Sequence, residues 1–246
     1  MRWRKLLVNN RKKQIVAGTS IAFLGLLLFL IYSGYLWPNN FFSASYLVHG
    51  IDISHHQKKI DWEQLARQKK YQFVFIKATE GNDFQDHKFL INWKGATRVG
   101  LLKGAYHYFT LGSSGQEQAM NFIKSVPKET GTLPPVIDLE ERGVGKEEFQ
   151  KELNDFIATV EEHYGQKPIL YVVYSIYEKY IKGDFDGYPI WIRDVVKPPQ
   201  LSDEREWDFW QYCDRAKLPG IKKAVDLNVF QGSIMDLKGL SRKNQN

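Results

Sequence analysis

The amino-acid sequence predicts an α/β protein: a TIM-like barrel of eight strands with about five outer helices, of the (β/α)5(β)3 type, preceded by one transmembrane helix. Eight short apolar runs recur along the chain, and the first five are each followed by a helical stretch, the fifth of which is shorter. Near the N-terminus lies an uncharged stretch long enough to span a bilayer. Five βα units and three further strands are sufficient to close a barrel.

The strand candidates are near-continuous apolar runs, which is typical of strands that are buried on both faces of a parallel sheet. They cover residues 47–54, 72–79, 101–109, 134–140, 168–175, 188–194, 207–212 and 224–230. Helices are expected at 61–70, which begins with an acidic residue, and at 145–164, which Gly165 ends. The apolar stripe of the second helix predicts core packing and no further function.

The formal charge of +6 comes from the N-terminus. Residues 1–46 contain six basic residues and no acidic one, whereas the other 200 residues contain 28 Lys/Arg and 28 Asp/Glu. No basic surface for nucleic acid is therefore expected. The uncharged residues 15–36 predict a signal-anchor helix, and the basic cluster before them favours a cytoplasmic N-terminus.

These features divide the chain into five expected segments. They are a cytoplasmic basic segment (1–14), a transmembrane signal-anchor helix (15–36), a linker (37–46), a barrel domain (47–240) and a polar tail (241–246). The barrel then lies on the extracytoplasmic side of the cell membrane, in a periplasm or at the cell surface. A cleaved signal peptide is the alternative, and it also exports the barrel. The single cysteine, Cys213, is expected to be a buried structural thiol.

Two carboxyls end the fourth strand candidate. Asp138 and Glu140 are two positions apart, so their side chains face the same way, with Cα atoms roughly 6.5–7 Å apart. At the carboxyl end of a barrel strand, both point into the mouth where such folds keep their active sites. Crowding raises the pKa of the more desolvated group, which leaves the proton donor and the anion that cleavage of a glycosidic bond needs. An acidic loop start is the alternative interpretation.

Two further acids lie within apolar strand candidates. Asp52 is in the first strand and Asp226 is in the last. A carboxyl is costly to bury unless it has a partner or a function. Since the first and last strands of a closed barrel are neighbours, we expect these two side chains to approach one another. Structural salt bridges are the alternative.

The strings HGIDISHHQ, IDW, FVFIKATEG, GAYHYF, PPVIDLE, WDFWQY and VDLNVF occur in this order within residues 48–232. This series resembles the family-25 glycoside hydrolases, lysozymes with an eight-stranded barrel that act on N-acetylmuramic acid linkages. The resemblance implies that peptidoglycan glycan strands are the substrate and that Glu140 is the general acid. It further implies that Asp138 orients or stabilises the acetamido group, while Asp52 and Asp226 tune the proton affinity of that pair and hold substrate or water.

Polar and aromatic residues near the strand ends are candidate substrate-binding residues: Lys77, Glu80, Tyr106, Tyr108, Tyr171, Trp191 and Gln211. Aromatic faces stack on sugar rings, although aromatic residues in strands often belong to the core. The chain departs from the family at the sixth strand, where Trp191-Ile192-Arg193-Asp194 replaces a Trp-aliphatic-Ala stretch. This charged pair is expected to change the rim of the sugar site.

Two other functions are left open by the sequence. A cell-wall-binding module would keep the barrel without turnover, although all four carboxyls are present. A metal-dependent polysaccharide deacetylase would need converging ligands, but the spacing His49-x-x-Asp52-x-x-His55 matches no metal signature, and a strand sends His49 and Asp52 to opposite faces. We therefore expect no metal and no cofactor.

The stereochemistry of bond cleavage is also left open. Inversion and retention need different carboxyl separations, and a pair on one strand falls near the boundary between them. Assistance by the acetamido oxygen of the substrate needs no protein nucleophile, and we favour it. The sequence predicts no oligomeric state.

Overall fold

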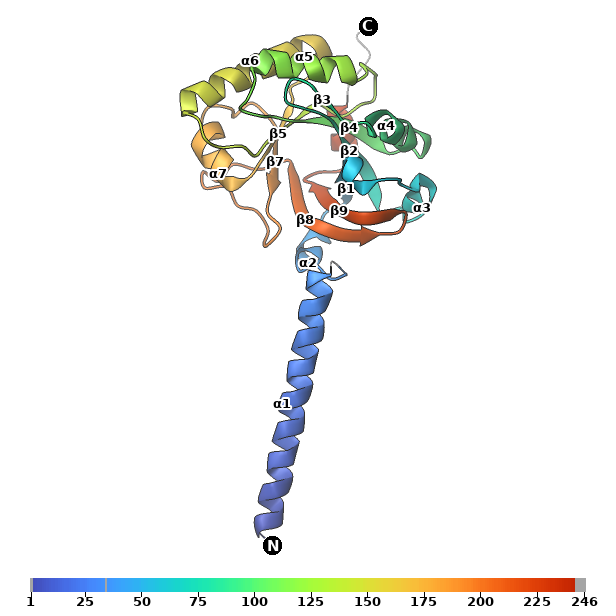
Figure 1. Ribbon diagram of the computed structural model, residues 1–246, viewed down its shortest axis with the longest axis vertical. Coiled ribbons are helices and arrows are strands. Elements are labelled where there is room, and N and C mark those ends of the chain that lie inside the picture. Colours follow the sequence, from blue (N-terminus) through green and yellow to red (C-terminus); the bar gives the residue numbers. More distant parts are fainter. Residues whose placement is uncertain (1, 34, 242–246) are drawn as a thin grey trace.

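The strands close into a barrel because β1 (Val48–Ile53) pairs both with β2 (Tyr71–Glu80) and with β9 (Ile221–Phe230). The computed structural model describes residues 2–33 and 35–241 (Figure 1). Between β2 and β9, the closed sheet continues through β4 (Leu102–Tyr108), β5 (Val136–Leu139), β6 (Ile169–Val172), β7 (Ile190–Arg193) and β8 (Phe209–Leu218). The predicted eight-stranded barrel is confirmed, and a two-residue strand, β3 (Phe84–Gln85), is added beside β2.

Strand direction departs from the expected parallel sheet at β9, which runs antiparallel to both β8 and β1. The turn between β8 and β9 is too short for the crossover that a parallel pair requires. Gly220 in this turn has φ +92°, and a Cβ atom there would lie 2.5 Å from the carbonyl oxygen of Asp61. Both β8 and β9 are longer than predicted. The charged residues 214–223, which the sequence did not assign to a strand, extend the β8–β9 pairing as a hairpin.

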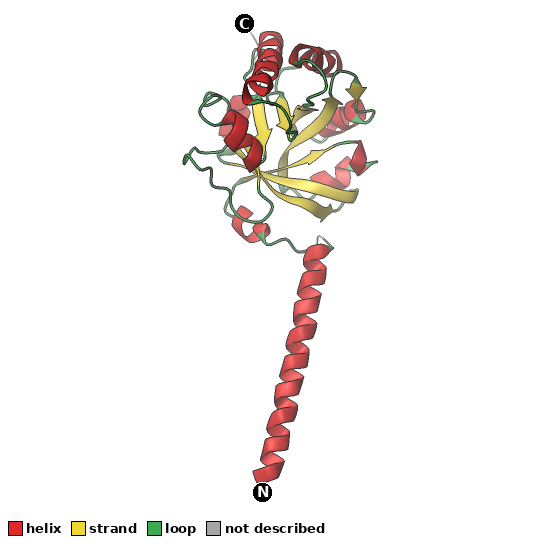
Figure 2. Ribbon diagram, turned by 60° about the vertical axis from the view of Figure 1, so that its left-hand side comes forward, coloured by secondary structure: helices red, strands yellow, loops and turns green. Residues whose placement is uncertain are grey.

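Helices follow the first five barrel strands and the last one, and they lie on the outside of the barrel (Figure 2). They are α3 (Trp62–Ala66), α4 (Phe89–Arg98), α5 (Gly115–Ser125), α6 (Lys146–Tyr164), and α7 (Tyr174–Ile176), which continues into the helical turn η2 (Tyr177–Ile181). The 3-10 turn η1 (His55–Gln57) follows β1, and α8 (Ile234–Leu240) follows β9. A helix therefore follows each of the first five barrel strands (β1, β2, β4, β5 and β6), as predicted.

The helix expected at 61–70 is shorter than predicted. The Asp61 side chain caps it by accepting the Gln64 N–H, but α3 ends at Ala66, and Lys69 then adopts a positive φ as the chain turns towards β2. The second predicted helix is confirmed as α6, whose buried stripe packs into the core. Gly165 ends it in the left-handed conformation, with φ 68°.

Aromatic side chains fill the barrel interior below its carboxyl end. Phe73, Phe75, Trp191 and Phe209 are buried, and the rings of Phe75 and Trp191 lie 4.9 Å apart. Two strand glycines make room for this layer: a Cβ atom at Gly50 would lie 2.3 Å from the Phe73 ring, and one at Gly104 would lie 2.4 Å from the Phe75 ring. The barrel is therefore a packed core that ends beneath the strand-end carboxyls.

The segment expected to be a linker, 37–46, is docked on the barrel. It contains the short helix α2 (Asn39–Ser43), which lies next to β8 (Figure 1). Trp37 donates its indole N–H to the Tyr212 carbonyl at 2.7 Å, and the buried Asn39 amide nitrogen lies 3.2 Å from the carbonyl oxygens of Asp194 and Tyr212. The segment is bound because its polar groups donate hydrogen bonds to buried carbonyls of β8 and of the residue that follows β7.

Helix α1 (Arg2–Tyr32) extends away from the barrel (Figure 1). Its part from Lys12 to Tyr32 is long and apolar enough to cross a membrane, by length and composition, and none of its apolar window is buried by the rest of the protein. Large apolar side chains such as Ile21 and Phe23 are about 70% exposed. The helix ends at Tyr32 rather than at residue 36, and 242–246 of the predicted tail lie outside the described residues.

Replacing Asn39 tests the docking of α2. Asn39→Ala removes one of the two donors to each of these carbonyls, which keep the indole N–H groups of Trp37 and Trp210, so we expect it to lower the free energy of unfolding by about 0.5–1.5 kcal/mol. Asn40→Ala, at the exposed neighbouring position, should change it by less than about 0.5 kcal/mol. Chemical denaturation of the full chain in detergent measures both values, and equal effects would contradict a docked segment.

Candidate active site

A cavity of about 250 Å³ opens at the carboxyl end of the barrel strands. All four predicted carboxyls line it, and so do four of the seven predicted substrate-binding residues. The lining residues are Asp52, Tyr106, Val136, Asp138, Glu140, Tyr171, Trp191, Arg193, Gln211, Asp214 and Asp226. The structure therefore brings together side chains from strands that are far apart in the sequence.

Asp52 and Asp226 are opposite one another in the β1–β9 register, as expected for strands that close a barrel. Burial and the charge of Asp52 raise the pKa of Asp226 well above its ordinary value, and Asp226 is hydrogen-bonded to Asp52. Burial also raises the pKa of Asp52, although hydrogen bonds to its carboxylate oppose the effect. The pair therefore carries one negative charge when Asp226 holds a proton and donates it to Asp52.

Two side-chain amides also bind Asp52. Its Oδ2 accepts a hydrogen bond from Asn228 Nδ2 at 2.7 Å and another from Gln211 Nε2 at 3.1 Å. The same amides accept hydrogen bonds from the wall of the cavity: Asn228 from the Trp191 indole at 2.9 Å, and Gln211 from the Tyr171 hydroxyl at 2.9 Å. Asn228 was missed by the sequence analysis, although a polar residue two positions after Asp226 in an apolar strand was a usable signal.

Asp138 and Glu140 differ in their exposure to solvent. Glu140 is exposed at the mouth, whereas Asp138 lies deeper. Burial, followed by the charges of Glu140 and Asp52, raises the pKa of Asp138 well above its ordinary value, and the charge of Lys77 acts in the opposite direction. Asp138 Oδ1 is buried and has no hydrogen-bond partner among the described residues. An unsatisfied acceptor in a cavity can be satisfied by an N–H or O–H group of a ligand.

Lys77, Glu80 and Tyr108 lie beside the cavity and are not among the residues that line it. Lys77 pairs with Glu80 at 2.6 Å, and its ammonium lies 4.9 Å from the centre of the Tyr108 ring. The three side chains therefore contact one another at the rim. Tyr106, two positions before Tyr108 on β4, does line the cavity, and His107 between them faces the helices, as alternation predicts.

The charged pair predicted at the sixth strand is divided between two faces. Arg193 lines the cavity and binds Asp214 at 2.8 Å, and Arg215 binds the other oxygen of Asp214 at 2.8 Å. Asp194 is buried and faces away, where it accepts a hydrogen bond from the Tyr174 hydroxyl. Of the two predicted residues, therefore, only Arg193 lines the cavity. Its partner Asp214 also lines the cavity, and the sequence analysis missed it because the predicted strand ended at residue 212.

Three other polar residues have structural surroundings. His107 lies between Thr79 and Gln118, and burial lowers its pKa to about 4, so it is neutral at pH 7. His49 contacts the Tyr46 carbonyl and is not among the residues that line the cavity. Cys213 is buried, and burial raises the pKa of its thiol to about 11, in agreement with the predicted structural role.

Comparison with known proteins identifies relatives over most of the barrel. The sequence profile of Glycosyl hydrolases family 25 matches residues 51–221. A family 25 glycosyl hydrolase from Bacillus anthracis has a similar structure, with a TM-score of 0.75 and 43% identity over 79% of this chain and 93% of that one. Among sequences, YegX of Escherichia coli is 40% identical, covering 80% of this chain and 74% of its own. Lysozyme M1 of Streptomyces globisporus is 31% identical, covering 79% and 71%.

Replacing Asp226 tests the electrostatics of the buried pair. The folded wild type keeps a proton on Asp226 that the unfolded chain releases above about pH 4, so its free energy of unfolding falls as the pH rises from there through the raised pKa. Asp226→Asn carries no proton to lose. We therefore expect it to be more stable than the wild type at pH 7, by roughly 1.4 kcal/mol for each unit by which the pKa is raised.

Asp214→Asn is the matched control in the same cavity. Burial alone would raise the pKa of Asp214, but Arg215 and Arg193 outweigh burial and lower it, so the carboxylate contributes stability above its unfolded pKa. This variant should be less stable than the wild type at pH 7. Denaturation curves between pH 4 and pH 8 measure both variants, and changes of the same sign would contradict the assignment.

Proposed function

Because the chain belongs to Glycosyl hydrolases family 25, we propose that it is a membrane-anchored lysozyme that cleaves the β-1,4 linkage between N-acetylmuramic acid and N-acetylglucosamine in peptidoglycan. Membership of the family makes the chain a glycoside hydrolase, and the name of its relative Lysozyme M1 supports peptidoglycan as the substrate. The observation that carries the proposal is the meeting of four carboxyls in one cavity at the carboxyl end of the barrel.

Glu140 is the proposed general acid. It is exposed at the mouth of the cavity, where the oxygen of a leaving sugar and an incoming water molecule both have access. In the first step, Glu140 donates its proton to the glycosidic oxygen as the bond to the sugar C1 breaks. In the second step, the Glu140 carboxylate accepts a proton from the water that attacks C1.

Asp138 is proposed to orient the acetamido group of the substrate. Its buried Oδ1 lacks a hydrogen-bond partner among the described residues, and the N–H of an acetamido group is a fitting donor. Holding this N–H directs the acetamido oxygen towards C1, so that a C1–O bond forms as the glycosidic bond breaks. The hydrolytic step then opens this bond, and no protein nucleophile is needed.

The remaining cavity residues are proposed to bind the glycan. Tyr106, Tyr171, Trp191 and Gln211 form the wall, and Lys77, Glu80 and Tyr108 extend the polar and aromatic surface along the rim. Asp52 and Asp226 hold the wall in place through the amides of Gln211 and Asn228, and their negative charge favours the positive charge that develops at the sugar.

We further propose that the N-terminal helix anchors the barrel to the cell membrane on the extracytoplasmic side. The exposed apolar span from Lys12 to Tyr32 and the basic residues that precede it support a cytoplasmic N-terminus. The proposed division is a cytoplasmic segment at 1–14, a membrane span within 15–36 and a catalytic unit that includes the docked α2 segment.

Digestion of purified peptidoglycan by the full chain tests the enzymatic proposal. We expect new reducing ends on N-acetylmuramic acid, identified by mass spectrometry, and a decrease in kcat of about 10²–10⁴-fold in Glu140→Gln. The neighbouring Glu141 is the matched control because its side chain accepts the Leu111 N–H and does not line the cavity, so Glu141→Gln should retain activity.

Three other outcomes would refute parts of the proposal. Reducing ends on N-acetylglucosamine would overturn the assigned bond. Acetate release without chain cleavage would indicate a deacetylase. Binding without any product would indicate a non-catalytic wall-binding module.

Cell fractionation tests the anchor. The full chain should stay in the membrane fraction after washing with high salt and alkaline carbonate, because an apolar span of this length is held by the bilayer rather than by charge. Protease added outside spheroplasts should degrade the barrel and spare an N-terminal epitope. Exporting residues 37–246 from a cleavable signal peptide gives the soluble control. A mature N-terminus after residue 36 in the natural chain would instead identify a cleaved signal peptide.

A further inference from the structure

A cluster of histidines lies beside the cavity. His55 and His56 belong to η1 after β1, and Asp86 and His87 follow β3. Potential ligand atoms of His55, Asp86 and His87, one from each residue, lie within 4.8 Å of one another. The ring centre of His55 is 5.3 Å from that of His87 and 4.1 Å from that of His56. The His55 imidazole therefore has one neighbouring imidazole from its own turn and another from the turn after β3.

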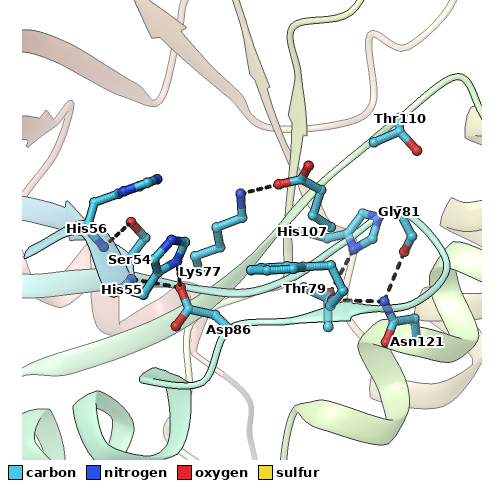
Figure 3. Close-up of polar contacts among 12 residues, drawn as sticks. Ser54, His55, His56, Lys77, Thr79, Gly81, Asp86, His107, Thr110 and Asn121 are labelled. Atoms are coloured by element: carbon cyan, nitrogen blue, oxygen red, sulfur yellow. Dashed lines mark hydrogen bonds and ion pairs between the residues drawn. The ribbon is translucent and has the colours of Figure 1, made fainter. Parts of the chain in front are cut away.

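Asp86 holds the central imidazole in a fixed orientation (Figure 3). Its buried carboxylate Oδ2 accepts the His55 backbone N–H at 2.8 Å and lies 2.9 Å from His55 Nδ1, while Oδ1 accepts the Lys88 N–H. When Nδ1 donates its hydrogen to this carboxylate, the lone pair of the neutral ring is on Nε2. A carboxylate behind an imidazole in this way is the usual arrangement of metal-ligating histidines.

The positions of the other imidazoles distinguish this cluster from a structural hydrogen bond. The bond between Asp86 and His55 alone would tie two turns together, as many buried carboxylates do. His56 and His87 are exposed, however, and each lies next to His55 rather than packing into the core. Their exposure leaves space for water molecules to complete a coordination shell.

We propose that this cluster binds a divalent transition-metal ion, with His55 and His87 as ligands, His56 beside them and Asp86 orienting His55. Imidazole ligands favour Zn²⁺, Ni²⁺ or Cu²⁺ over Ca²⁺ and Mg²⁺, which prefer oxygen. The bound ion connects η1 with the turn between β3 and α4. Phe84 of β3 contacts both His55 and Lys77, so the ion lies at the rim that Lys77 and Tyr108 also form.

The spacing of histidines along the chain did not predict this site, because His55 and His87 come from different turns that only the fold brings together. None of the cluster residues lines the cavity. Metal binding is therefore separate from the proposed hydrolysis, and either proposal can fail without the other.

Titration with Zn²⁺ tests the proposal on the full chain, purified in detergent without a histidine tag and stripped of metal by a chelator. We expect saturable binding of a single Zn²⁺ ion, measured by calorimetry, and a rise in Tm. Co²⁺ should give the visible absorption bands of a protein-bound ion. Excess Ca²⁺ or Mg²⁺ should displace neither metal.

Variants then locate the site. His87→Ala and His55→Ala should each weaken Zn²⁺ binding by at least about tenfold, and Asp86→Asn by about 10–100-fold, as loss of an orienting carboxylate does elsewhere. His87 is exposed, so its replacement leaves the fold intact. His163→Ala is the matched control, because His163 is half-buried like His55 but belongs to α6. No saturable binding, or binding that is unchanged in both His55→Ala and His87→Ala, would overturn the proposal.

Discussion

The hydrogen bonds that converge on the buried carboxylate of Asp52 are the interaction on which the cavity depends. Asn228 and Gln211 donate to it, and these amides in turn hold the indole of Trp191 and the hydroxyl of Tyr171. A buried charge is tolerated when its oxygens are satisfied, so the network offsets part of the cost of burial. Asp52 lies where β1 pairs with β9, which makes closure of the barrel and assembly of the cavity a single event.

The packed interior below the cavity accounts for the raised pKa values of its carboxyls. The layer that contains Phe75, Trp191 and Phe209 excludes water beneath the strand ends, so a negative charge there is poorly solvated. Adjacent carboxyls add repulsion, which a shared proton between Asp52 and Asp226 reduces. The protein therefore gives up some stability at neutral pH to keep several acids together, which is common at functional sites.

The N-terminal region is joined to the barrel by hydrogen bonds as well as by the continuous chain. The docked α2 segment satisfies the carbonyls of Asp194 and Tyr212 at β7 and β8, so the apolar helix α1 leaves from a fixed point on the domain. For an enzyme that is held at a membrane, this attachment would limit both the distance and the orientation of the cavity relative to the wall. The sequence predicted a linker at 37–46, and the structure shows that this segment is also bound to the barrel.

The sequence by itself determined the number of barrel strands, the helices after the first five, the end of α6 at Gly165 and the presence of four acids within or directly after apolar strands. These features follow from local periodicity and from the cost of placing a charge in an apolar run. Only the tertiary structure decided that β9 runs antiparallel, that Asp214 lines the cavity, that Asn228 binds Asp52, that Lys77 lies outside the lining, and that His55 meets His87. Such contacts depend on strand register and on which turns become neighbours when the barrel closes, and a linear pattern of residues does not specify either one.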